Sequence, residues 1–233
     1  MIFNKNCLDV MKNIETATID LIVTDPPYKI TKRGNNGNAG GMFKGKKSLD
    51  GNIFKYNDIS PKEYLPEFFR ILKEDSHCYV MSNHINLQNM LNTATEVGFK
   101  FVKCLIWNKG NKIMGQYYMN QFEYILFLRK PKGKKINNCG TSDILSIPNK
   151  KDKDENGKNL HDTQKPVELM KILVENSSQE GDIVLDPFMG IGSTGLACIE
   201  CGRNFIGVEL DPQYFEIAER RLDEAKKNII NED

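Results

Sequence analysis

The chain has 233 residues, of which 39% are hydrophobic and 27% are charged, and its formal net charge at pH 7 is +1. This length suits one sizeable core, so we expect a single domain over residues 1–233. No window reaches the roughly 18 consecutive apolar residues of a membrane span, and the first residues lack the zones of a signal peptide, so we expect a folded cytoplasmic protein. The net charge alone gives no argument for a polyanionic partner.

The cysteines and histidines indicate neither disulfides nor a metal. Six cysteines are scattered along the chain, and four of them lie in apolar runs, where a free thiol behaves as a small hydrophobe. Cys198 and Cys201 form a C-x-x-C pair, but the three histidines lie far away in sequence. We therefore expect no metal site.

The first elements in chain order are a strand, a long loop and a helix. The β-branched run at residues 19–24 predicts a buried parallel strand that ends at Asp25-Pro26-Pro27-Tyr28. Residues 29–57 are rich in Gly and Asn without a period, which predicts a mobile loop. Ser60 and Glu63 form a capping-box pattern with Pro61 at the first helical position, which predicts the start of a helix.

Strands and helices continue to alternate along the rest of the chain. The expected strands cover residues 78–81, 100–107, 122–128, 182–185 and 204–208, and the expected helices cover residues 85–97, 163–177 and 212–226. Pro166 would lie in the first turn of the second of these helices. We interpret the polar, lysine-rich residues 129–157 as an exposed insertion. The alternation predicts an α/β fold with an open, mostly parallel sheet covered on both faces by helices.

A glycine-rich turn follows the expected strand at residues 182–185. Asp186 to Gly195 reads DPFMGIGSTG and satisfies G-x-G-x-x-G, a turn that lets a ligand approach the backbone at a helix N-terminus. Glu209 ends the next strand, where a carboxylate can accept hydrogen bonds from both hydroxyls of a ribose. Together they predict a nucleoside-containing cofactor, and they do not distinguish a dinucleotide from S-adenosylmethionine.

The residues Asp25 to Tyr28 suit chemistry on the amino group of a base. Such an amine is a poor nucleophile because its lone pair is conjugated into the ring, so an enzyme must orient acceptors at its N–H groups. Asp25 and the carbonyl of Pro26 would supply two acceptors. The ring of Tyr28 would stack on a base extruded from the helix.

Both motifs resemble those of one enzyme family. Asp25 to Tyr28 resembles the catalytic D-P-P-Y motif of DNA amino-methyltransferases, and Asp186 to Gly192 resembles their F-x-G-x-G cofactor motif. Their order is similar to that of the β class, which is circularly rearranged relative to other methyltransferases. The resemblance covers almost the whole chain and implies a Rossmann-like S-adenosylmethionine-dependent methyltransferase fold. It also implies methyl transfer from S-adenosylmethionine to a flipped base in double-stranded DNA, and Asp25 in place of Ser favours adenine N6.

The resemblance implies further site residues. His161 to Pro166 resembles the segment H-x-T-Q-K-P, which places His161 and Lys165 at the methionyl end of the cofactor. Asn6-Cys7 occupies the place of the family's Gly-Asp-Cys, with the Asn6 carbonyl in place of the aspartate. The expected catalytic residues are Asp25, Pro26 and Tyr28, and the expected cofactor-binding residues are Asn6, Cys7, Asp25, His161, Lys165, Asp186, Phe188, Gly190, Gly192, Ser193 and Glu209.

DNA contacts are expected in two lysine-rich segments. The family reads its target sequence between the last strand and the H-x-T-Q-K-P segment, here at about residues 129–160. Lysines would neutralise phosphates, while arginine and asparagine could address base edges. The expected DNA contacts are Lys44, Lys46 and Lys47 in the loop at residues 29–57, and Arg129, Lys132, Lys134 and Lys135. A homodimer is expected from the family, and a restriction endonuclease as partner stays open.

Four alternatives compete with this interpretation. Cytosine N4 is the rival target within the same chemistry, and related enzymes methylate RNA or glutamine side chains of proteins. A nucleotide-dependent oxidoreductase would leave Asp25 to Tyr28 unexplained. A catalytically silent DNA-binding module would need no cofactor pocket. The motif order and the lysine-rich segments favour a DNA methyltransferase.

Overall fold

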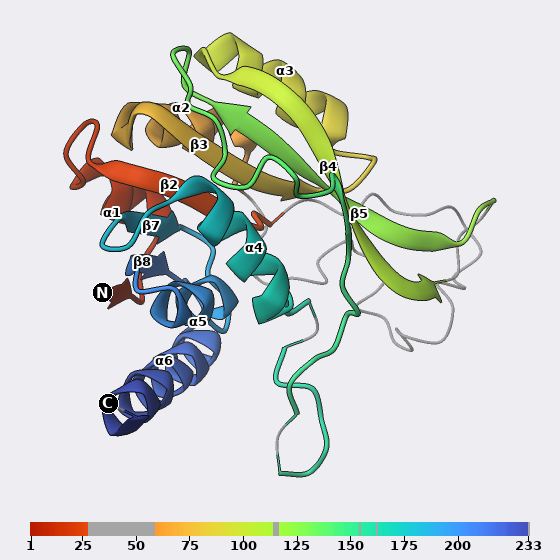
Figure 1. Ribbon diagram of the computed structural model, residues 1–233, viewed down its shortest axis with the longest axis vertical. Coiled ribbons are helices and arrows are strands. Elements are labelled where there is room, and N and C mark those ends of the chain that lie inside the picture. The colour runs from red at the N-terminus through yellow and green to blue at the C-terminus, as the bar shows by residue number, and fades with distance from the viewer. Residues whose placement is uncertain (28–58, 114–116, 154, 162, 233) are drawn as a thin grey trace.

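The computed structural model describes residues 1–27, 59–113, 117–153, 155–161 and 163–232. Within them, eight strands form one sheet in the order β1-β8-β7-β2-β3-β5-β4-β6 (Figure 1). The strands are β1 (Ile2–Phe3), β2 (Ile19–Thr24), β3 (Leu72–Ser82), β4 (Lys100–Ile113), β5 (Asn120–Arg129), β6 (Ile144–Ser146), β7 (Ile183–Asp186) and β8 (Asn204–Val208). β5 runs antiparallel to both β3 and β4, and the other neighbours are parallel. The predicted α/β class with a mostly parallel sheet is confirmed.

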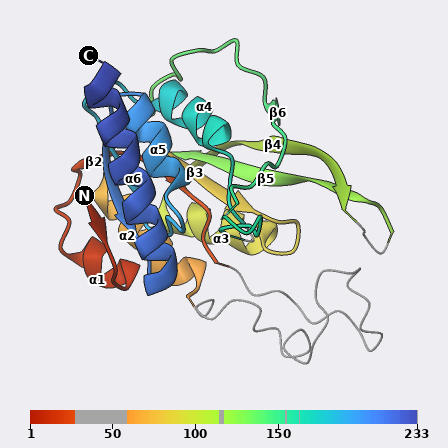
Figure 2. The ribbon, with the colours of Figure 1, turned by 90° about the horizontal axis from the view of Figure 1, so that it is seen from below.

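Helices cover both faces of the sheet (Figure 2). The helices are α1 (Cys7–Lys12), α2 (Pro61–Ile71), α3 (Leu87–Val97), α4 (Val167–Ser177), α5 (Ser193–Glu200) and α6 (Pro212–Glu232). The first three pack on one face through a core that includes Met11, Phe68 and Met90. The last three pack on the other face through a core that includes Leu173 and Leu222. Among the described helices, none combines the length and apolar character that a membrane crossing requires.

A local signal in the sequence sets the start of α2, while α4 begins later than predicted. The backbone N–H of Ser60 donates to Glu63 Oε2 at 2.8 Å, which completes the predicted capping box at the start of α2. The predicted helix at residues 163–177 begins later, at Val167, because Pro166 has extended geometry and forms the N-cap. Thr163 lies in a turn, and Gln164 to Pro166 have no regular secondary structure.

Most of the described residues between 129 and 157 are exposed, as predicted, and a few are buried. They contain β6, which pairs with β4, and the side chain of Lys130 is buried. Asn137 donates from Nδ2 to the carbonyls of Glu175 and Ser178 at the end of α4. The interpretation as an exposed insertion therefore holds for most of this segment, while β6 and the Asn137 side chain attach it to the sheet and to the end of α4. The expected loop at residues 29–57 lies outside the described residues.

Candidate active site

The carboxyl ends of the parallel strands bring the predicted motifs to one edge of the sheet. β7 pairs with β2 on one side and with β8 on the other, all three parallel. Asp25 follows β2, the glycine-rich turn follows β7, and Glu209 follows β8. Three motifs that lie far apart in sequence therefore share one edge, as their positions after strands predict.

Asp186 organises the glycine-rich turn. Its Oδ1 accepts from Thr24 Oγ1 at 2.7 Å and from the backbone N–H of Phe188 at 3.1 Å, and its Oδ2 accepts from Thr194 Oγ1 at 2.6 Å. Burial raises the pKa of Asp186 to about 6, although these three hydrogen bonds oppose the shift. The carboxylate thus joins β2, the turn and α5. A direct contact from Asp186 to a cofactor stays a prediction.

Two glycines let the turn and α5 pack as they do. Gly192 is the N-cap of α5 with a φ of +82°, a left-handed conformation that favours glycine. A Cβ on Gly195 would lie 2.7 Å from side-chain atoms of both Leu222 and Phe205. The close approach of α5 to its neighbours therefore requires glycine at position 195. Ser193, expected at the cofactor, begins α5 and is buried.

Glu209 is tied to the same turn. Its Oε2 accepts from the backbone N–H of Gly190 at 3.0 Å, and its Oε1 accepts from the backbone N–H of Asp211 at 2.7 Å. Burial raises the pKa of Glu209, and these backbone hydrogen bonds oppose the shift. A carboxylate offers about four lone pairs, so the group retains acceptor capacity at the end of β8.

His161 lies against the glycine-rich turn. A Cβ on Gly190 would lie 3.8 Å from His161 Nε2, and the imidazole packs on the ring of Tyr214 with centroids 4.2 Å apart. His161 Nδ1 accepts from the backbone N–H of Thr163 at 3.1 Å, so a neutral ring carries its proton on Nε2. The ring nitrogen nearest to Gly190 is then a hydrogen-bond donor.

Lys165 contacts the predicted catalytic carboxylate. The Lys165 ammonium donates to Asp25 Oδ2, a contact across 140 positions of sequence. The side chain of Lys165 is 8% exposed. The other oxygen, Asp25 Oδ1, is buried and has no hydrogen-bond partner among the described residues. Lys165 was expected at the cofactor, which stays a prediction, and the structure places its ammonium against Asp25 of the D-P-P-Y motif.

Glu123 on β5 is a site residue that sequence reasoning missed. Its Oε2 lies 3.6 Å from Lys165 Nζ, so two carboxylates flank one ammonium. Burial raises the pKa of Asp25 and the negative charge of Glu123 adds to the rise, while Lys165 opposes it. A glutamate inside the apolar run FEYILFL was the available signal, because a buried charge needs a partner.

The remaining expected cofactor residues have structural contacts. Asn6 Oδ1 accepts from the backbone N–H of Leu8 at 2.9 Å and caps α1, so the carbonyl expected to replace the family's aspartate already has a donor. Cys7 is buried, which raises the pKa of its thiol to about 12. Phe188 packs edge-on against Tyr64 with ring centroids 5.4 Å apart. Roles for Asn6, Cys7 and Phe188 at the cofactor stay predictions.

The expected DNA-binding residues do not gather at this edge. His77 pairs with Arg129 and Ser82 pairs with Tyr124 in the β3·β5 ladder, so Arg129 lies at the edge opposite to Asp25. Lys132, Lys134 and Lys135 follow Arg129 there, and the Lys134 carbonyl contacts the His77 ring. Arg129 and the lysines after it lie at the opposite edge because β5 runs antiparallel to β3. Tyr28, Lys44, Lys46 and Lys47 lie outside the described residues.

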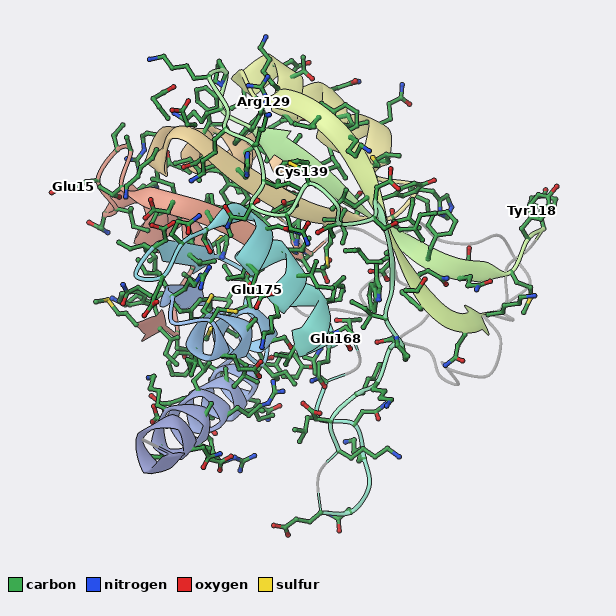
Figure 3. All side chains as sticks on the ribbon, viewed as in Figure 1. Glu15, Tyr118, Arg129, Cys139, Glu168 and Glu175 are labelled. Carbon is green, nitrogen blue, oxygen red and sulfur yellow. The ribbon has the colours of Figure 1, made fainter. Side chains whose placement is uncertain are left out.

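A hairpin of β4 and β5 extends beyond the edge that carries Asp25. The ladder continues past Tyr124 to the pair of Ile113 and Asn120. Tyr117 and Tyr118 lie near the tip and are 88% and 90% exposed. In Figure 3, Tyr118 marks the projecting end of this hairpin and Arg129 the opposite end of β5. Exposed aromatic side chains therefore lie beyond the same edge of the sheet as Asp25.

Comparisons with known proteins identify the family of the chain. A family model described as N6_N4_Mtase, DNA methylase, matches residues 19–220. The type II methyltransferase M.HinfI of Haemophilus influenzae is 33% identical over 97% of this chain and 69% of its own length. The structure titled M1.HpyAVI-SAM complex has a TM-score of 0.70 and 24% identity, covering 95% of this chain and 99% of that one. PvuII DNA methyltransferase, cytosine-N4-specific, has a TM-score of 0.71 and 17% identity over 99% and 92% of the two chains. Because the family model spans most of the chain and both of its motifs, the chain belongs to the N6_N4_Mtase family of DNA methylases.

Proposed function

We propose that the chain transfers the methyl group of S-adenosylmethionine to the N6 amino group of an adenine extruded from double-stranded DNA. The observation that carries the proposal is the buried Asp25 Oδ1, which has no hydrogen-bond partner among the described residues. A buried acceptor without a donor is unfavourable unless a ligand supplies one. An amino group of a base has the required N–H.

The residues at the edge of the sheet fit S-adenosylmethionine. The carboxylate of Glu209 has lone pairs for the ribose hydroxyls, and the absent Cβ of Gly190 leaves room beside His161. When bound, the cofactor supplies a methyl group on a positively charged sulfur, a strong electrophile. The chain therefore needs to orient the amine and to accept its proton.

Asp25 has the electrostatic properties for that task. Burial and the charge of Glu123 raise its pKa, which makes the ionised carboxylate a stronger hydrogen-bond acceptor. Lys165 holds one oxygen and the other is left for an N–H of the base. The carbonyl of Pro26 would accept from the second N–H, and the ring of Tyr28 would stack on the extruded base.

The choice of adenine over cytosine rests on Asp25. In the resemblance described above, cytosine-N4 enzymes more often have Ser at this position. The fold does not separate the two targets, because the cytosine-N4-specific PvuII enzyme shares it. Cytosine N4 is therefore the second candidate, and RNA or protein amino groups are a more distant one.

We propose the β4–β5 hairpin as a DNA contact in addition to the expected lysines. It extends from the edge that carries Asp25, and Tyr117 and Tyr118 are exposed near its tip. Aromatic rings stack on bases with about 1 to 3 kcal/mol per base. Since Lys132, Lys134 and Lys135 lie at the opposite edge, they would reach a duplex bound at Asp25 only through a second copy of the chain. A homodimer, expected from the family, would provide that copy.

Nucleoside analysis tests the proposed function. Purified protein is incubated with plasmid DNA and S-adenosylmethionine. The DNA is then digested to nucleosides, which are separated by liquid chromatography and identified by mass spectrometry. The expected product is N6-methyl-2′-deoxyadenosine, and N4-methyl-2′-deoxycytidine would support the second candidate. Asp25→Ala should lower the rate by about 100-fold or more, as expected for losing one aligned stabilising group. A folded Asp25→Ala variant that methylates DNA at the normal rate would contradict the assignment.

A further inference from the structure

A chain of four charged side chains continues from the proposed catalytic carboxylate into the sheet. The Lys165 ammonium donates to Asp25 Oδ2, Glu123 Oε2 lies 3.6 Å from Lys165 Nζ, and Lys109 donates to Glu123 Oε1. The exposed fractions are 22% for Asp25, 8% for Lys165, 19% for Glu123 and 12% for Lys109. Water therefore screens these charges weakly.

The sheet explains why these groups meet. Trp107 on β4 and Glu123 on β5 are directly opposite in the ladder, so their side chains lie on one face. Lys109 is two residues further along β4 and shares that face. Its ammonium lies 4.9 Å from the centre of the Trp107 ring, and the indole N–H donates to the Ile147 carbonyl at 2.9 Å. Two strands and a buried indole thus hold Lys109 and Glu123 in place.

The charges balance within this chain of side chains. Burial alone would raise the pKa of Glu123, but the ammonium groups of Lys165 and Lys109 outweigh it, and the pKa is lowered. Glu123 is therefore ionised at neutral pH. Removing one member of a buried ion-pair network leaves an uncompensated charge, which is strongly unfavourable. Among these four groups, Lys165 has two carboxylate neighbours, Asp25 and Glu123. Without Glu123, the Lys165 ammonium would pair with Asp25 alone of the two.

We propose that Glu123, supported by Lys109, is a positioning residue for methyl transfer: it shares the Lys165 ammonium with Asp25 and keeps Asp25 Oδ1 available for the amino group of the target base. The inference rests on the proposed role of Asp25. Glu123 makes no contact with the reacting atoms in this scheme. Its effect reaches them through Lys165.

Other charged and titratable groups also act on Asp25. Lys165 precedes α4, Glu123 lies on β5 and Lys109 on β4, while Asp186 at the end of β7 and Tyr64 on α2 interact with it electrostatically. Among them, the charge of Glu123 raises the pKa of Asp25 and the charge of Lys109 lowers it. Neutralising Glu123 should therefore lower the pKa of Asp25, and neutralising Lys109 should raise it.

The pH dependence of the methylation rate tests the inference. The rate falls as pH falls through the pKa of Asp25, because the carboxylate must be ionised to accept an N–H. Glu123→Gln should move this acidic limb to lower pH, and Lys109→Met should move it to higher pH. The turnover rate of Glu123→Gln should fall by about tenfold, within the range of coupling inside one ion-pair network, while KM for S-adenosylmethionine is unchanged. Glu123→Asp, which keeps the charge, should recover part of the loss.

The assay measures total radioactive methyl incorporation into plasmid DNA, so it does not depend on which base is methylated. Lys103→Met is the matched control, because Lys103 is also on β4 but pairs with Asp143 at an exposed site. Its acidic limb should stay in place. Equilibrium binding of S-adenosylmethionine verifies that each variant is folded.

The outcomes separate the inference from the function on which it rests. Acidic limbs that stay in place, or that move in the same direction in Glu123→Gln and Lys109→Met, overturn the positioning role. If Asp25→Asn also methylates at the normal rate, the proposed role of Asp25 fails with it. If Asp25→Asn is inactive while the other two variants behave like the wild type, only the positioning role fails.

Discussion

Replacing Asp186 with Asn tests the buried carboxylate beneath the glycine-rich turn. Oδ1 of an Asn side chain can still accept from Thr24 Oγ1 and from the backbone N–H of Phe188. Its Nδ2 can donate to Thr194 Oγ1, because a hydroxyl oxygen can accept as well as donate. The substitution therefore removes a buried charge and leaves the shape and the hydrogen bonds nearly intact. Asp186 is only 4% exposed, so water screens the charge of its carboxylate weakly.

The magnitude follows from the raised pKa. Burial moves the pKa of Asp186 from 3.8 to about 6, so folding favours the protonated form. The resulting stability is fully present below the unfolded-state pKa and is lost as pH rises through the folded-state value. At about 1.4 kcal/mol per pH unit, the whole effect is about 3 kcal/mol, and about 2 kcal/mol of it falls between roughly pH 4.5 and pH 7.5.

Urea unfolding at a series of pH values measures this effect. Trp107 is the only tryptophan of the chain and is 1% exposed, so its fluorescence reports unfolding. Relative to Asp186→Asn, the wild type should lose about 2 kcal/mol of unfolding free energy over that pH range. Asp223→Asn at an exposed site on α6 is the control and should track the wild type. A difference between wild type and Asp186→Asn that does not vary with pH would refute the reasoning.

Four further predictions concern the cofactor, the core and DNA. Glu209→Ala should weaken binding of S-adenosylmethionine by about 1.5 to 3 kcal/mol in calorimetry, and an unchanged affinity would mean that the cofactor site is misplaced. Gly195→Val should lower stability by about 1 to 3 kcal/mol in thermal denaturation, because its Cβ would lie 2.7 Å from Leu222 and Phe205; an unchanged melting temperature would contradict the close packing. Tyr28→Ala should lower the methylation rate far more than Tyr28→Phe, since stacking needs the ring and not the hydroxyl; equal losses would argue against stacking. The affinity for DNA should fall steeply with salt in a titration, because bound lysines release counterions, and a flat response would argue against phosphate contacts.

The capping box and the ends of two strands, which depend on neighbours in sequence, were predicted correctly. The capping box of Ser60 and Glu63 forms because its two hydrogen bonds join residues three positions apart. The end of β2 before Asp25 and the end of β7 at Asp186 follow from apolar runs that stop at turn-forming residues. Parallel strands then carry both motifs to one edge of the sheet, so their shared edge followed from the sequence as well.

Features that depend on strand direction and long-range contacts required the structure. The β4–β5 hairpin makes β5 antiparallel to β3 and β4. This direction places Arg129 at the edge opposite to Asp25, and it places Glu123 close to Asp25 and Lys165. The pattern of apolar residues is the same in both strand directions, so periodicity could not predict this outcome. The sequence by itself determined the fold class and the two motifs, because each rests on local hydrogen bonds and apolar periodicity. Only the tertiary structure joined Lys165 to Asp25 across 140 positions, because electrostatic pairing between buried charges depends on distance in space and not on distance along the chain.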